Sequence, residues 1–112
     1  MNRWIQGLLI TLLILLMAPG LGNTAGSSEG AELFQQHCAA CHINGGNIIR
    51  RGKTLKMKAL ERQGIASVDA IAQIAREGVG QMSGYGDVLG PGGDQLVAEW
   101  IWEQAQNAWI QG

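Results

Sequence analysis

The stretch QQHCAACHING, residues 35–45, holds both cysteines of the 112-residue chain. Cys38 and Cys41 lie three positions apart, and His42 follows the second cysteine directly. On a helix, residues at this spacing face the same side. Two thiols and an imidazole are therefore presented together at one point of the chain.

The C-x-x-C-H pattern is typical of covalent haem attachment. Cys38 and Cys41 can each form a thioether to one edge of a porphyrin, and His42 is then carried beneath the ring as a ligand of the iron. A thioredoxin-type pair would need a preceding strand in a βαβ unit, and a zinc site would need four ligands. A plain local disulfide is the third alternative. Because the histidine adjoins the second cysteine, we predict one covalently bound haem c.

Residues 1–26 have the order of a secretory signal peptide and a short linker. A positive start, MNRW, precedes an apolar run over 5–17 and the small-residue stretch APGLGNTAGSS. The run is shorter than the ~20 apolar residues of a membrane span, and an uncleaved anchor is the alternative. We expect cleavage between Gly20 and Gly26, leaving a single domain over 27–112. Export leads to an oxidising compartment, where free thiols do not persist.

Helical periodicity dominates the rest of the chain, and no alternating strand pattern is present. Helices are expected from Ser28 through the cysteine segment, over 55–63 after Thr54, over 68–77 after Ser67, and over 94–106. Residues 78–93 contain seven glycines and are expected to form a loop. The predicted fold class is all-α. A domain this small usually needs a cofactor, metal or disulfide for stability, and haem would meet that need.

The second axial ligand of a haem iron would come from Met82. His37 lies on the same helix as Cys38 and cannot reach the opposite face of the ring. Met57 lies in a helical pattern beside Leu60 and is expected in the core. Met82 follows His42 by forty residues, within the glycine-rich segment, and can wrap around the cofactor.

Several motifs together resemble the class I c-type cytochromes, most closely the cytochrome c6 family with its c6B and c6C variants. They are CAACH, NGGN, GKTLK, ALE, MSGYG and a Trp-containing last helix, between residue 30 and about residue 104. The resemblance implies a class I cytochrome c fold, about four helices wrapped around one covalently bound haem. It also implies the ligands named above, and a crossing of the first and last helices where Gly30 and Phe34 meet Trp100.

The sequence departs from that family near the haem. Ser83 follows Met82 where relatives usually have proline. Ile74 aligns with a position that is often glutamine, so it is a candidate for tuning the haem, although Gln73 lies one step away and could supply the amide. Lys53, in GKTL, is a candidate contact for a haem propionate.

The resemblance implies a soluble, exported carrier of single electrons, in photosynthetic or respiratory transport, in the thylakoid lumen or periplasm. Its partners would be a cytochrome b6f-type donor and a photosystem I or terminal oxidase acceptor. Because histidine and methionine would occupy both axial positions, we expect no enzymatic activity. The alternative is a haem-based sensor or a peroxidase-like protein with a labile Met82. We expect a monomer, and the net charge of −1 does not favour nucleic-acid binding.

Two surface features remain open. Six cations lie within thirteen residues and form either a docking surface for an acidic partner or an ordinary solvated face. Trp102 and Trp109 do not share the helical face of Trp100, and they would form a contact surface or a loosely packed tail. The six cations, called the basic cluster below, are Arg50, Arg51, Lys53, Lys56, Lys58 and Arg62.

Overall fold

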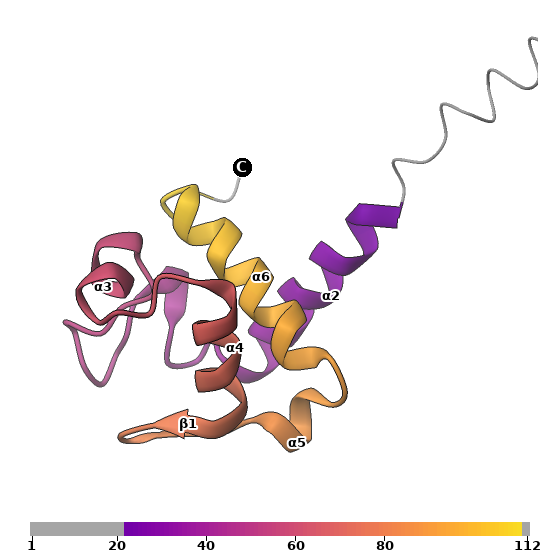
Figure 1. The fold of residues 1–112 in the computed structure, drawn as a ribbon. Coiled ribbons are helices and arrows are strands. Elements are labelled where there is room, and N and C mark those ends of the chain that lie inside the picture. The colour runs from indigo at the N-terminus through magenta and orange to yellow at the C-terminus, as the bar shows by residue number, and fades with distance from the viewer. Residues whose placement is uncertain (1–21, 111–112) are drawn as a thin grey trace, which may run out of the picture.

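A computed structural model shows a mostly helical fold (Figure 1). It describes residues 22–110, so most of the predicted signal peptide lies outside the described residues. Among residues 22–110, no helix has both the length and the apolar composition needed to cross a membrane. The helices are α2 (Gly22–His37), α3 (Met57–Arg62), α4 (Val68–Glu77), α5 (Gly86–Leu89) and α6 (Gly93–Gln106), with a 3-10 turn, η2 (Ile43–Gly45), and strands β1 (Gly78–Val79) and β2 (Met82–Ser83).

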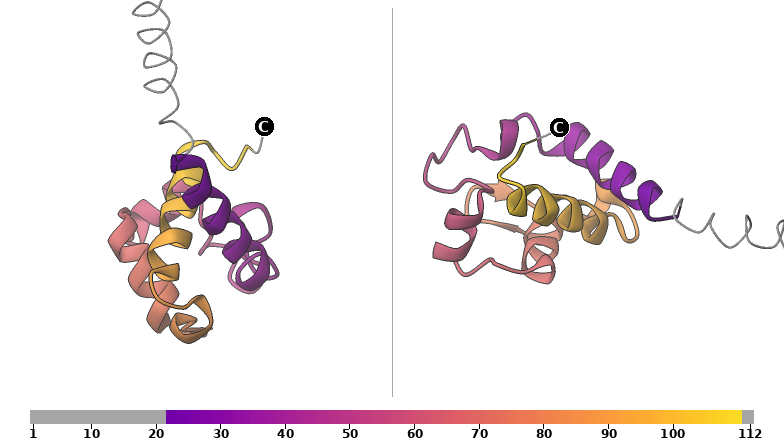
Figure 2. Two further views of the ribbon diagram at one scale, coloured as in Figure 1. Left: turned by 90° about the vertical axis from the view of Figure 1, so that its right-hand side faces the viewer. Right: turned by 90° about the horizontal axis from the view of Figure 1, so that it is seen from above.

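Helices α2 and α6 cross at a glycine, as the family resemblance implied (Figures 1 and 2). A Cβ added to Gly30 would lie 2.5 Å from the carbonyl oxygen of Leu96 and 2.9 Å from the Cβ of Trp100. One turn later, the centroids of the Phe34 and Trp100 rings lie 4.8 Å apart. The missing side chain therefore allows the close approach, and the two aromatic rings fill the space beside it.

Helix α4 has the bounds that its capping signals predict. The Oγ of Ser67 accepts a hydrogen bond from the backbone N–H of Ala70 at 3.1 Å. The helix ends at Gly78, whose φ of +82° is in the left-handed region. Its buried face, formed by Ile71, Ala72 and Ala75, packs against α6.

Two predicted helix starts are wrong. Ser28 does not cap the first helix, because α2 already begins at Gly22. Thr54 precedes α3 but is not its cap, because the helix begins at Met57 with Lys56 in the capping position. The Thr54 hydroxyl accepts a 3.4 Å hydrogen bond from the Lys56 N–H, which holds a turn ahead of the helix.

The glycine-rich segment, predicted as a loop, contains regular secondary structure. Strands β1 and β2 form an antiparallel hairpin, in which Val79 lies opposite Met82. The hairpin packs tightly on the end of α4, because a Cβ added to Gly84 would lie 2.5 Å from the carbonyl oxygen of Arg76. The Tyr85 N–H also donates to the Ala75 carbonyl at 2.8 Å. The predicted helical architecture is confirmed, with a small two-stranded sheet added to its helices.

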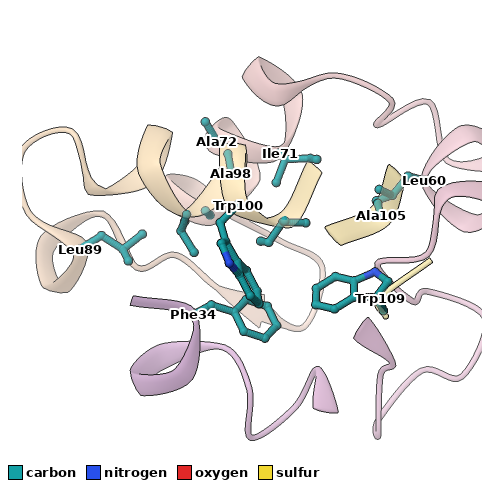
Figure 3. Close-up of a cluster of buried hydrophobic side chains, with 12 residues drawn as sticks. Phe34, Leu60, Ile71, Ala72, Leu89, Ala98, Trp100, Ala105 and Trp109 are labelled. Atoms are coloured by element: carbon teal, nitrogen blue, oxygen red, sulfur yellow. The ribbon is translucent and has the colours of Figure 1, made fainter. Parts of the chain in front are cut away.

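Trp109 lies in the core, so both expectations for it, a contact surface and a loose tail, are wrong (Figure 3). Its side chain is 3% exposed. The centroid of its ring lies 5.5 Å from that of Phe34 and 5.7 Å from that of Trp100. Left-handed φ angles at Ala108 (53°) and Trp109 (59°) turn the chain back onto the core after α6. Trp102 is half-buried and packs against the same core.

Candidate haem site

The cysteine segment continues the hydrogen-bonding pattern of α2 beyond the last residue of the helix. The Cys38 N–H donates to the Phe34 carbonyl at 2.8 Å, and the His42 N–H donates to the Cys38 carbonyl at 3.0 Å. Cys38, Cys41 and His42 are all half-buried. The fold thus holds the two thiols and the imidazole on consecutive turns that begin at the core residue Phe34.

Both cysteines are free thiols in the structure, as thioether formation requires. Burial, and secondarily the charge of Cys41, raises the pKa of the Cys38 thiol to about 11. Redox-active C-x-x-C pairs depend on a lowered thiol pKa, so this shift has the wrong sign for thioredoxin-type chemistry. Among residues 22–110, no three His, Cys, Asp or Glu side chains gather into a potential metal site.

The imidazole of His42 is oriented by the loop that follows it. Its Nδ1 lies 2.8 Å from the carbonyl oxygen of Gly46. A carbonyl can only accept, so Nδ1 carries the hydrogen, and in the neutral imidazole Nε2 then keeps a lone pair. Histidines that bind metals are commonly oriented by a hydrogen bond of this kind from the other ring nitrogen. The two free thiols and the available Nε2 therefore fit a covalently attached haem.

The two candidate methionines have different settings. Met57 is the first residue of α3, half-buried and packed against the core, as expected. Met82 is half-buried in β2, and its position is fixed by pairing with Val79 rather than by a flexible loop.

The residues proposed to contact or tune the haem lie on two elements. Ile74 is half-buried on α4, whereas Gln73 is exposed and its amide donates to Glu77 Oε2 at 3.2 Å. Whether Ile74 or Gln73 lies nearer the haem stays a prediction. Lys53 is exposed, and its carbonyl accepts a 2.9 Å hydrogen bond from the Asn47 side chain.

The sequence did not reveal the backbone group that accepts the hydrogen bond from His42, or the tryptophan that packs on the turn after it. The acceptor is the carbonyl of Gly46, and Gly45 is buried against the indole of Trp109. The glycine pair after His42 does signal a tight turn. It carries no information about a tryptophan more than sixty residues away in the sequence.

The basic cluster lies at the surface. All six of its side chains are exposed, and the apolar side chains of Ile48 and Ile49, 62% and 65% exposed, adjoin Arg50 in the sequence. Asn47 organises this loop, because its side-chain oxygen accepts hydrogen bonds from the N–H groups of Ile49 and Arg50.

The fold and the C-x-x-C-H site together define a class I c-type cytochrome, and comparisons with known proteins narrow this class. A family model described as cytochrome c oxidase, cbb3-type, subunit III matches residues 25–101. A cytochrome c6-like protein of Nostoc sp. (strain PCC 7120) is 40% identical over 111 residues, covering 97% of this chain and 99% of the relative. The chain belongs to this family of c-type cytochromes and, within it, to the cytochrome c6-like proteins.

Solved structures agree with this assignment. Cytochrome c6B from Synechococcus sp. WH8102 is 75% identical with a TM-score of 0.73, covering 75% of this chain and 96% of that one. Cytochrome c6C from Synechococcus sp. PCC 7002 is 48% identical with a TM-score of 0.68, covering 70% and 96%. The protein therefore binds a single covalently attached haem c and carries electrons between redox protein partners.

Proposed function

We propose that this cytochrome is exported and holds its haem through thioethers to Cys38 and Cys41, with His42 as the proximal and Met82 as the distal iron ligand. The observation that carries the proposal is the 2.8 Å hydrogen bond from His42 Nδ1 to Gly46, which leaves Nε2 available for iron beside two free thiols. Haem bound in this way supplies a one-electron couple, and methionine ligation favours the reduced state relative to a second histidine.

The protein's own residues would hold the haem, orient the His42 imidazole and keep Met82 in position. The thioethers would fix the ring to the end of α2, and the Gly46 carbonyl would fix the His42 imidazole. The β1–β2 hairpin would hold Met82 as the second iron ligand. Two strong axial ligands leave no open position for a substrate, so we propose electron transfer without enzymatic catalysis.

A labile distal methionine, as in a ligand sensor or a peroxidase-like protein, has less support. That alternative depends on a mobile glycine-rich loop. Gly78 and Gly84 instead allow tight packing, since a Cβ on either would lie 2.5 Å from a backbone oxygen. The packing of the hairpin on α4 favours a Met82 that remains in place.

The similarity to the c6-like proteins supports a proposal for the physiological setting. We propose that residues 1–26 direct export to the thylakoid lumen or periplasm, where residues 27–112 function as a monomer. The donor would be a cytochrome b6f-type complex and the acceptor photosystem I or a terminal oxidase. The exposed basic cluster would steer the protein toward acidic surfaces on such partners. Lys53 would lie near a propionate, and Ile74 would tune the haem.

Extraction with acidified acetone tests the proposed attachment. In the wild-type protein the haem should stay with the polypeptide, because thioethers survive the treatment. Replacing Cys38 and Cys41 together by serine should release it, whereas Ser67→Ala, a substitution at the α4 cap, should not. Loss of haem from the wild-type protein would contradict thioether attachment. A visible spectrum lacking the methionine-to-iron band would contradict ligation by Met82.

A further inference from the structure

Trp109 is held in the core at a conformational cost. It follows α6 and is reached through two consecutive non-glycine residues with positive φ, Ala108 and Trp109 itself. Left-handed backbone costs such residues ~1–2 kcal/mol each. A tail that keeps this geometry must be stabilised by the contacts of the indole, so those contacts show what Trp109 holds in place.

The indole contacts residues on both sides of the haem-attachment segment, and Figure 3 shows it beside Phe34. Before the segment, the ring of Phe34 lies 5.5 Å away. After it, Gly45 packs so closely that a Cβ there would lie 2.4 Å from the indole ring atoms. The indole Nε1–H also donates to the Leu55 carbonyl at 3.0 Å, and the Leu55 N–H donates to the Gly45 carbonyl at 2.8 Å.

These contacts reach the proximal imidazole within two residues. The Gly45 N–H donates to the His42 carbonyl at 3.1 Å, and the next residue, Gly46, accepts the hydrogen bond from His42 Nδ1. We propose that Trp109 is a positioning residue for the haem: it holds the Gly45–Gly46 turn so that the Gly46 carbonyl stays on Nδ1 of His42. The inference rests on the proposed role of His42 as the proximal ligand.

The direction of the effect on the reduction potential follows from the hydrogen bond. An acceptor on Nδ1 makes the imidazole a stronger donor to the metal. Stronger donation stabilises the oxidised iron and lowers the potential. When the indole is removed, the turn can relax and the hydrogen bond weakens. The potential should then rise, although no ligand of the iron has changed.

Three variants of the holoprotein test this inference. Trp109→Ala removes both the packing on Gly45 and the hydrogen bond to Leu55. Trp109→Phe keeps a ring in the core but loses the hydrogen bond to Leu55. Trp102→Phe is the matched control, since it replaces a half-buried tryptophan of α6 that packs on the same core but does not make the hydrogen bond to Leu55. The readouts are a redox titration and the hydrogen-exchange rate of the His42 Nδ1–H, followed by NMR in the reduced protein.

We expect Trp109→Ala to shift the ratio of reduced to oxidised protein at fixed potential at least threefold toward reduced, or ~28 mV for a one-electron couple. Exchange of the Nδ1–H should accelerate by tenfold or more. Trp109→Phe should shift both readouts in the same direction by less, and Trp102→Phe should leave both unchanged. If Trp109→Ala does not fold, Trp109→Phe carries the test.

Lower thermal stability of the Trp109 variants, with an unchanged potential and unchanged Nδ1–H exchange, would reduce Trp109 to a core residue and overturn the inference. A potential that falls would do the same. The wild-type spectrum separates this failure from that of the proposed function. If it lacks the signature of histidine–methionine ligation, the ligand assignment is wrong, whereas a normal spectrum with unresponsive variants contradicts only the role of Trp109.

Discussion

At the scale of single residues, the assignment of Met82 as the distal ligand is open to a direct comparison. Met82→Ala should abolish the methionine-to-iron charge-transfer band at the red end of the spectrum and allow carbon monoxide to bind. Met57→Ala is the matched control, because both side chains are half-buried. It should keep the band and lower the free energy of unfolding by ~2 kcal/mol, the low end for Met-to-Ala changes. The opposite pattern would make Met57 the ligand.

Ile74 provides a second comparison at this scale. An amide near the haem and its methionine can donate a hydrogen bond and change the field at the iron, which an aliphatic side chain cannot do. Ile74→Gln should therefore raise the midpoint potential in a redox titration. Haem proteins as a group span ~0.8 V through their axial ligands, so we expect a shift on the order of a tenth of that range.

Gln73→Ala is the control for Ile74→Gln. The Gln73 amide is exposed and donates to Glu77, so its removal should leave the potential unchanged. If Gln73→Ala moves the potential and Ile74→Gln does not, the alignment is displaced by one residue and Gln73 lies nearer the haem.

At the scale of secondary-structure elements, the packing of the β1–β2 hairpin on α4 should determine whether Met82 can bind iron. Gly84→Ala would place a Cβ 2.5 Å from the carbonyl oxygen of Arg76 and 2.7 Å from the carbonyl carbon of Glu77. Because both neighbours are backbone atoms, the hairpin must move away from the helix. We expect a weaker methionine-to-iron band and a loss of ~2–3 kcal/mol of stability, in the range for overpacking.

Gly52→Ala is the matched control for this substitution. A Cβ at Gly52 meets no atom within 4 Å, so stability should change by less than ~0.5 kcal/mol and the band should persist. If Gly84→Ala changed stability and the band as little as Gly52→Ala, the hairpin would be able to shift without cost. A labile Met82 would then regain support.

The ion pair between α4 and α6 predicts a pH dependence. Arg76 Nη1 lies 2.5 Å from Asp94 Oδ2, and this hydrogen bond lowers the pKa of Asp94 below its ordinary value of 3.8. The stability contributed is complete above pH 3.8 and is lost as the pH falls through the lowered pKa of the folded state. Because Arg76 is 49% exposed, the pair should contribute no more than ~1 kcal/mol.

Arg76→Gln tests this ion pair. An NMR titration of the variant should show the pKa of the Asp94 carboxyl higher than in the wild type, and acid unfolding should lose the component below pH 3.8. An unchanged Asp94 pKa would show that its backbone hydrogen bonds, and not Arg76, hold the carboxylate in its ionised form.

Local chemistry explains which elements could be predicted from the sequence. Ser67 and Gly78 delimit α4 because a cap and a left-handed glycine are signals within the segment itself. The β1–β2 hairpin could not be predicted, because strands of two residues are too short to show alternation. For the candidate site, the C-x-x-C-H pattern is local in the sequence, but the contacts that hold the turn after His42 are not. Trp109 reaches Gly45 through a tail with two left-handed non-glycine residues, which no propensity predicts.

At the scale of the whole molecule, the charge distribution should govern how fast the protein meets its partners. The basic cluster is exposed throughout, although the net charge of the chain is −1. Neutralising Arg50→Gln and Arg51→Gln together should slow reduction or oxidation by an acidic partner severalfold at low salt and leave the midpoint potential unchanged. The difference should shrink as salt is added, because charges are screened over ~10 Å at 0.1 M ionic strength.

The control for this change must alter the net charge equally at another place. Gln95→Glu with Gln106→Glu does so on exposed positions of α6, and both double variants have a formal charge of −1 − 2 = −3. If the position of the charge matters, only the arginine variant slows the reaction, since steering depends on the local field at the docking face. If both slow it equally, the partner responds to the overall charge alone. Rates insensitive to salt and to both changes would leave the basic cluster as an ordinary solvated surface, and the electron would have to enter or leave through a face of the molecule elsewhere.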